Sequence, residues 1–208
     1  VMEVQFAVSK ISKWASRESG DTLEMIERPH GGLSMVLVDG QTSGRSAKNI
    51  SNVVARKAVQ LLGEGVRDGA AARAAHDYLF TYRSGKVSAT LNILSVDTNT
   101  RTIVISRNNE APVLVRTATD GFYLLDGESK AVGVHRNTKP VIAEIPIEVG
   151  TIVVAFTDGL RHAGSLSGKG RSYDPFVALQ EMVGIGICDA HAICDRLLEE
   201  AMAMDDGR

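Results

Sequence analysis

The 208-residue chain has little of several features that mark particular classes of protein. Its two cysteines, Cys188 and Cys194, lie six positions apart, which matches no metal or redox spacing, so a reduced, cytoplasmic compartment is expected. No apolar run approaches the roughly 20 residues that a membrane span needs. No basic segment followed by an apolar core precedes the first strand, so no export signal is expected.

An excess of charge of one sign is also lacking. The 23 basic side chains nearly balance the 25 acidic ones, and the formal net charge is -2. Lysines and arginines are scattered along the sequence, and no basic run interleaves with the aromatic residues, which make up only 5% of the chain. Nucleic-acid and membrane partners are therefore not expected. The sequence gives no indication of the oligomeric state.

The hydrophobic pattern predicts strands interrupted by paired helices. Helical spacing of apolar residues covers 46–62 and 70–82, the second helix starting at Asp68, and 175–183 and 190–204, the last capped by Asp189. Strands are predicted at 2–11, 24–28, 33–38, 87–96, 102–106, 113–116, 122–125, 141–147 and 151–156. The turn at 29–32 is predicted to join the strands 24–28 and 33–38 as a hairpin. Short turns at 98–100, 119–121 and 148–150 indicate antiparallel neighbours.

Paired helices among antiparallel strands predict an α+β fold rather than a doubly wound one. The strands at 33–38 and 151–156 are apolar on successive residues, so both of their faces must be covered. Two stacked antiparallel sheets, each flanked by a helix pair, meet this requirement as a four-layer α-β-β-α sandwich. No repeat, low-complexity segment or proline-rich linker marks a boundary, so residues 1–208 are expected to form a single domain.

Asp-Gly pairs are the candidates for chemistry. Six occur, beginning at Asp39, Asp68, Asp120, Asp126, Asp158 and Asp206. Most Asp-Gly pairs are turns. Asp120 has the context of a hairpin turn, and Asp68 that of a helix cap. Asp39 and Asp158 differ, because each ends a fully apolar strand and leads into a loop without an immediate return strand. Two carboxylates held at strand ends favour a hard divalent cation, although spacing alone leaves a turn with a cap as the commoner alternative.

Four stretches together extend this interpretation. They are Ser19-Gly20-Asp21, Val36-Leu37-Val38-Asp39-Gly40 followed by Gly44, Asn108-Asn109-Glu110-Ala111-Pro112, and Ala155-Phe156-Thr157-Asp158-Gly159-Leu160. In their order and intervening helices, they resemble the PPM (protein phosphatase 2C-like) family of metal-dependent serine/threonine phosphatases. The likeness is closer to its bacterial branch, which includes the sporulation stage II E phosphatase and regulators of stress sigma factors, and it covers nearly the whole chain.

The resemblance implies the same sandwich with a centre of two divalent cations, Mn²⁺ or Mg²⁺. Asp39 would bridge the two ions, Gly40 would offer its carbonyl, Asp158 would bind one ion and Asp21 would serve the other. A hydroxide bridging the ions would attack phosphoserine or phosphothreonine in line. The substrate implied is a phosphoprotein of bacterial signalling, such as an anti-sigma-factor antagonist.

Three departures from the family pattern concern other residues. Gln41 stands where the eukaryotic branch has a histidine that protonates the leaving group; His162 is a candidate substitute or an ordinary loop histidine. Arg17, four residues before Asp21, would grip phosphate or lie solvated at the surface. Asp205 and Asp206 are interpreted as a turn before a missing last strand, so the fourth carboxylate of the family is expected to be absent.

Two alternatives to the phosphatase remain open. The first is a catalytically incomplete regulatory module of the same fold that binds a phosphoprotein without turning it over. Gln41 and the missing carboxylate favour this module, whereas Asp21, Asp39 and Asp158 favour the enzyme. The second is a metal-dependent phosphoester hydrolase that acts on small molecules.

Overall fold

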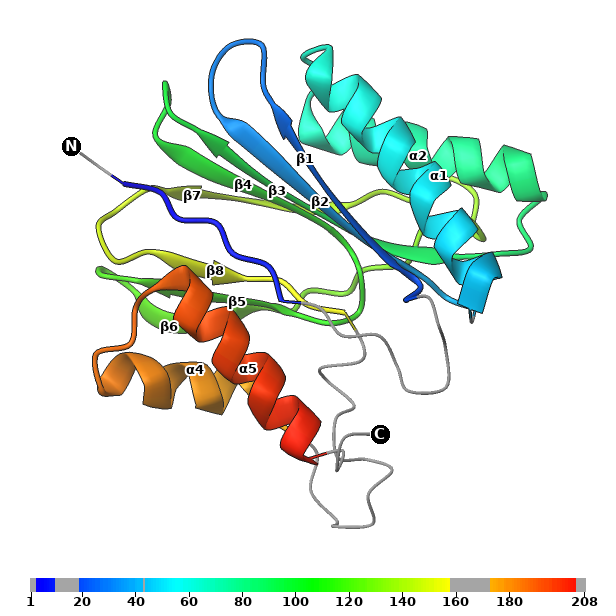
Figure 1. The fold of residues 1–208 in the computed structure, drawn as a ribbon. Helices are drawn as coiled ribbons and strands as arrows, with labels where there is room; N and C mark the ends of the chain where they lie inside the picture. The colour runs from blue at the N-terminus through cyan, green and yellow to red at the C-terminus, as the bar shows by residue number, and fades with distance from the viewer. Residues whose placement is uncertain (1–2, 10–18, 43, 158–172, 205–208) are drawn as a thin grey trace. The chain divides into compact units, whose positions relative to one another are not determined.

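A computed structural model of the chain describes residues 3–9, 19–42, 44–157 and 173–204 (Figure 1). The chain divides into two compact units. The larger unit comprises Glu18–Pro112 and Asp126–Ile147; the smaller comprises Val1–Arg17, Val113–Leu125 and Glu148–Arg208. Each unit contains one antiparallel sheet and one pair of helices, and each is described by itself.

The larger unit holds a five-stranded sheet of order β1-β2-β3-β4-β7. Its elements are β1 (Asp21–Glu27), β2 (Leu33–Gly40), α1 (Gly44–Gly63), α2 (Asp68–Arg83), β3 (Ala89–Asp97), β4 (Thr102–Asn108) and β7 (Val141–Pro146). All neighbouring strands of this sheet pair antiparallel. Helices α1 and α2 lie together on one face of the sheet (Figure 1).

One apolar core joins the sheet and the helices of the larger unit. Burial alternates along β2, so that Val36 and Val38 are fully buried on the face toward the helices. Helix α1 presents an apolar stripe at intervals of three or four residues. The core consists of Val36, Val38, Ile50, Val54, Ala55, Ala58, Leu62, Ala71, Ala72, Ala75, Leu79, Ala89, Leu91, Ile93 and Val132.

Asp68 belongs to a buried polar network and does not cap α2 as predicted. The residue before the helix is Arg67, which makes no side-chain cap hydrogen bond. The Asp68 carboxylate accepts a hydrogen bond from Ser95 of β3 and lies 3.8 Å from the Arg28 guanidinium. Ser95 in turn hydrogen-bonds Ser34 of β2 at 2.6 Å. The network therefore connects the start of α2 to two central strands.

His76 of α2 connects the helix pair to the segment that contains Gly133. Its ring is buried, and Nδ1 accepts a hydrogen bond of 2.9 Å from the Gly133 backbone N–H. Gly133 has φ of 110°, and a Cβ there would lie 2.4 Å from the Val87 carbonyl oxygen, so only glycine fits. Burial lowers the pKa of His76, while the negative charge of Asp77 opposes that shift.

The smaller unit has a three-stranded sheet of order β6-β5-β8. Its elements are β5 (Val113–Thr117), β6 (Gly121–Leu125), β8 (Ile152–Val154), α4 (Pro175–Gly184) and α5 (Ala190–Met204). Asp174 caps α4 by accepting hydrogen bonds from two backbone N–H groups. Phe176 of α4 meets Phe122 of β6 edge to face at 6.5 Å, which fixes the helix beside the sheet.

The structure confirms the predicted hairpin of β1 and β2 and the four predicted helices. Asp189 caps α5 as expected, since its carboxylate accepts from the Ala192 N–H at 2.9 Å. None of the described helices combines the length and the apolar character that crossing a bilayer requires.

Two further expectations were wrong. Residues 3–9 form no strand; Gln5 accepts a hydrogen bond from the first N–H of α5, and Cys194 of α5 donates to the Ala7 carbonyl at 3.4 Å. The turn at 148–150 does not join neighbouring strands, because β7 pairs with β4 and β8 pairs with β5. A short turn reverses the direction of the chain, but it does not determine which strand the next strand pairs with.

Protonation of His76 is expected to make the fold less stable in acid. The unfolded ring takes up a proton near its ordinary pKa of about 6.5, whereas the buried ring holds Nδ1 unprotonated to accept from Gly133. The free energy of unfolding should therefore fall as pH drops below about 6.5, by at most about 1.4 kcal/mol per pH unit from this group. Urea unfolding between pH 7.5 and 5.5 measures the slope. The matched variant His76→Gln, which offers an acceptor that does not titrate, should show a smaller slope, and equal slopes would contradict the assignment.

Candidate metal centre

Asp21 and Asp39 face each other across the β1–β2 hairpin. They are direct partners in the antiparallel register, so their side chains project from the same face of the sheet. The Gly40 N–H donates to the Gly20 carbonyl at 3.2 Å, which makes Gly20 and Gly40 a hydrogen-bonded pair. The adjacent pair, Asp21 and Asp39, is then of the non-hydrogen-bonded type, in which side chains come closest. The fold thus brings two of the predicted carboxylates together.

Helix α1 packs so tightly on the end of the hairpin that two glycines are required there. A Cβ on Gly40 would lie 2.3 Å from the Ala47 carbonyl oxygen. A Cβ on Gly20 would lie 2.9 Å from the Ala47 Cβ, and 3.5 Å from both the Asp39 Oδ1 and the Gly40 carbonyl oxygen. These two oxygens therefore converge on one small space, which any side chain at position 20 would enter.

Polar contacts from α1 fix the first strand in this arrangement. The Lys48 Nζ donates to the Asp21 carbonyl oxygen at 2.5 Å. The Thr22 hydroxyl bonds the Ser51 hydroxyl at 2.7 Å and donates to the Asn52 side-chain oxygen at 2.8 Å. Helix α1 consequently determines the position of Asp21 as well as that of Gly40.

Gln41, which follows Gly40, is held by the main chain. Its backbone N–H donates to the Ser88 carbonyl at 3.0 Å, and its side-chain amide donates to the Asp39 carbonyl at 3.3 Å. A glutamine amide does not titrate, so Gln41 offers no proton to a leaving group. The contact with Ser88 also places the end of β2 beside a neighbouring pocket.

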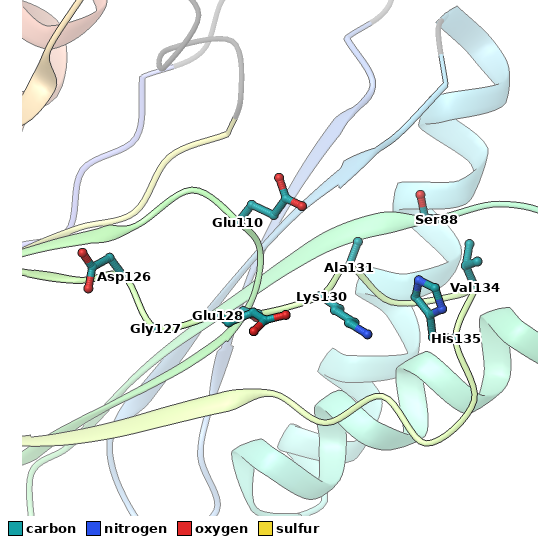
Figure 2. Close-up of a pocket in the computed structure, with 10 residues that line it drawn as sticks. Ser88, Glu110, Asp126, Gly127, Glu128, Lys130, Ala131, Val134 and His135 are labelled. Carbon is teal, nitrogen blue, oxygen red and sulfur yellow. The ribbon is translucent and has the colours of Figure 1, made fainter.

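That pocket has a volume of about 470 Å³ and lies within the larger unit. Figure 2 shows its lining side chains, which come from the start of β3, the loop after β4 and the segment between β6 and β7. Three of them are acidic (Glu110, Asp126 and Glu128), and two carry basic groups (Lys130 and His135). Glu110 belongs to one of the four stretches on which the family resemblance rests.

Arg107 is a buried residue that the sequence analysis missed. Its guanidinium donates to the Asn109 carbonyl at 2.7 Å and to the Gly127 carbonyl, and its own carbonyl accepts from the Ser129 hydroxyl at 2.7 Å. Burial lowers the pKa of Arg107, and the negative charge of Asp126 opposes that effect. Arg107 thereby joins the loop carrying Glu110 to the segment carrying Glu128. Nothing in its sequence context distinguishes it from a surface arginine at a strand end.

The remaining predicted site residues lie outside the described part of the chain. They are Arg17, Asp158, His162, Asp205 and Asp206. Within the described residues, no group of three or more histidine, cysteine, aspartate or glutamate side chains gathers in a way that holds a metal ion. The described portion of the candidate centre therefore consists of Asp21, Asp39 and the Gly40 carbonyl.

These three groups fit a divalent cation of the Mg²⁺ or Mn²⁺ type. All are oxygen donors, the ligands that such hard cations prefer. Like charges directly opposite each other on a sheet are destabilising, and a bound cation would offset that repulsion.

Comparison with solved structures defines the class of fold. The phosphatase domain of SpoIIE from Bacillus subtilis, solved with a fragment of its regulatory domain, superposes with a TM-score of 0.74 at 17% identity over 91% of this chain. This chain spans 55% of that one. RsbX in complex with magnesium gives a TM-score of 0.72 at 14% identity, covering 94% of this chain and 86% of that one. The catalytic domain of PstP with two manganese ions gives 0.69 at 12% identity, covering 96% and 91%.

The fold is thus the α+β fold of PP2C phosphatase domains, with two antiparallel sheets and their helix pairs, as predicted. The family profile of stage II sporulation protein E matches residues 29–208, and the chain belongs to that family. The predicted resemblance to the PPM family and its sporulation and sigma-regulator branch is therefore confirmed. No curated protein matches the sequence significantly.

Replacing Gly40 by alanine is expected to disturb the candidate centre. The added methyl group would meet the Ala47 backbone, which is not free to move without shifting α1. We expect a loss of about 1–3 kcal/mol in the free energy of unfolding, together with weaker Mn²⁺ binding by calorimetry. Gly184→Ala is the control, because nothing lies within 4 Å of its added Cβ. If Gly40→Ala matched this control in both measurements, the close packing of α1 on β2 would be refuted.

Lys48 is expected to act as a positioning residue for Asp21. Lys48→Met removes the donor to the Asp21 carbonyl and should weaken Mn²⁺ binding severalfold, with a loss of about 1–2 kcal/mol in unfolding free energy. Lys48→Arg should retain part of the Mn²⁺ affinity and part of the free energy of unfolding that Lys48→Met loses. Lys57→Met serves as the control, since that ammonium lies over the Tyr78 ring of α2. Tighter Mn²⁺ binding in Lys48→Met would show instead that the lysine charge merely competes with the cation.

Proposed function

We propose that this chain is the catalytic domain of a metal-dependent phosphatase acting on phosphoserine or phosphothreonine of a bacterial signalling protein. The observation that carries the proposal is the direct opposition of Asp21 and Asp39, with the Gly40 carbonyl beside them. Membership of the stage II sporulation protein E family and the PP2C fold support it. Two relatives of this fold were solved with magnesium or with two manganese ions.

In this proposal, Asp39 would serve both cations, the Gly40 carbonyl would be offered as a further ligand, and Asp21 would serve one of the cations. Asp158, from the stretch resembling the family motif, completes the ligand set. When bound, the two cations supply positive charge for the phosphate oxygens and a nucleophile at neutral pH. Tight packing of α1 against the hairpin keeps the oxygen donors in place before the ions arrive.

The substrate class follows from the chemistry of this centre and from the branch of the family. A centre of cations at the end of a sheet accepts a phosphate monoester, and the leaving group is a serine or threonine hydroxyl. Arg17, four residues before Asp21, is proposed to contact the phosphate. An anti-sigma-factor antagonist is the kind of phosphoprotein partner that the sigma-regulator branch points to. A cytoplasmic location accords with that partner.

The test is hydrolysis of para-nitrophenyl phosphate and of a phosphoserine peptide with Mn²⁺, with Mg²⁺ or with chelator. We expect turnover that the chelator abolishes and that Asp39→Asn lowers by at least about 100-fold, because one ligand shared by both cations loses its charge. Asp120→Asn is the matched control: Asp120 also begins an Asp-Gly pair, but it lies exposed at the turn between β5 and β6. Its activity should equal that of the wild type.

Absence of turnover in a folded protein saturated with Mn²⁺ would overturn the enzymatic proposal. If Asp39→Asn then left phosphoprotein binding unchanged, the regulatory module of the same fold would replace it. Equal activity toward small phosphoesters and phosphoproteins would point to the small-molecule hydrolase.

A further inference from the structure

Helix α1 carries an unbalanced set of charges. Its 20 residues include four basic side chains, Arg45, Lys48, Arg56 and Lys57, and no acidic one. Lys48 is partly buried and bonds to Asp21, whereas Arg45 and Arg56 are exposed. Because these two arginines lie 11 residues apart, about three turns, they share one face of the helix. Neutral Asn49 and Asn52 lie between them on that face.

Two tyrosines of α2 lie beside Lys57, the residue that follows Arg56. Tyr78 and Tyr82 are 46% and 62% exposed, so both rings offer apolar area at the surface. Their rings stack at 6.1 Å with an interplanar angle of 10°, and the Lys57 Nζ lies 5.6 Å from the centre of the Tyr78 ring. We call the surface formed by these residues the α1–α2 cationic surface; it consists of Arg45, Arg56, Lys57, Tyr78 and Tyr82.

The position of this surface relates it to the candidate metal centre. Helix α1 begins four residues after Gly40 and packs on the ends of β1 and β2. The surface therefore starts beside Asp21 and Asp39 and runs away from them along α1. From Arg45 to Arg56 the rise is roughly 16 Å, a distance that an extended peptide covers in about five residues.

We infer that the α1–α2 cationic surface binds an acidic segment of the phosphoprotein substrate, located about five residues from the phosphorylated side chain. This inference rests on the proposed function. Charge complementarity carries it, since α1 carries four cations and no acidic side chain, and the tyrosines supply apolar area beside Lys57. A protein segment suits the surface better than nucleic acid, because the cations are few and spaced by neutral residues and the chain has a net charge of -2.

The test compares two fluorescent phosphoserine peptides by anisotropy at low salt with chelator present, so that no turnover occurs. One peptide carries three glutamates centred five residues from the phosphoserine, and the other carries glutamines there. We expect the glutamate peptide to bind at least about fivefold more tightly. The double variant Arg56→Glu/Lys57→Glu should abolish that preference, and Tyr82→Ser should reduce it about threefold.

The matched control is Arg101→Glu/Lys139→Glu, which reverses two exposed charges of the larger unit away from α1 and should keep the preference. Equal binding of the two peptides, or loss of the preference in the control, would overturn the inference. The inference would also be overturned if a 15-nucleotide single-stranded DNA displaced the glutamate peptide more strongly than an unlabelled copy of that peptide does. A sedimentation shift that Arg56→Glu/Lys57→Glu abolishes would overturn it too, because a second copy of the chain would then occupy the surface. Hydrolysis of para-nitrophenyl phosphate by the wild type reports the proposed function separately, so the two ideas can fail independently.

Discussion

The structure of the larger unit is organised around two carboxylates held directly opposite each other. The register of β1 and β2 places Asp21 against Asp39, a pairing that costs free energy because like charges repel across a strand pair. The fold keeps the pairing nonetheless: α1 lies against Gly40 and donates through Lys48 to the Asp21 carbonyl. In the function proposed above, a bound divalent cation would be held by these oxygen donors and would offset the repulsion between the two carboxylates.

Buried polar groups extend this organisation beyond the centre. Arg107 joins the loop of Glu110 to the segment between β6 and β7, while Asp68 and Ser95 connect α2 to the sheet. Each of these groups is costly to bury unless it is hydrogen-bonded. The hydrogen bonds of Arg107 hold the loop of Glu110 at the end of the sheet where Asp39 lies. The Asp68–Ser95 network holds α2 at the opposite end of β2 and β3.

Much of this could be predicted from the sequence, and the reasons for the remainder are physical. Strong periodicity located the helices, and the apolar run ending at Asp39 located the strand that carries this aspartate. The sequence did not predict that β7 and β8 belong to different sheets, because the turn between them has the same sequence pattern whichever strand β8 pairs with. Arg107 and the inward direction of Asp68 were missed because burial of a polar residue depends on partners far away in sequence. For the same reason, lysines and arginines that are scattered in the sequence gather on the face of α1.

The proposed function requires Asp21, Asp39 and the Gly40 carbonyl to hold divalent metal. Anomalous diffraction from crystals of the chain soaked in Mn²⁺, recorded at the manganese edge, measures this binding. We expect a strong anomalous peak within coordination distance of the Asp39 carboxylate and the Gly40 carbonyl, with Asp21 beside it. A Mn²⁺-saturated crystal with no peak there, or with its manganese in the pocket between Glu110 and Glu128 instead, would contradict it.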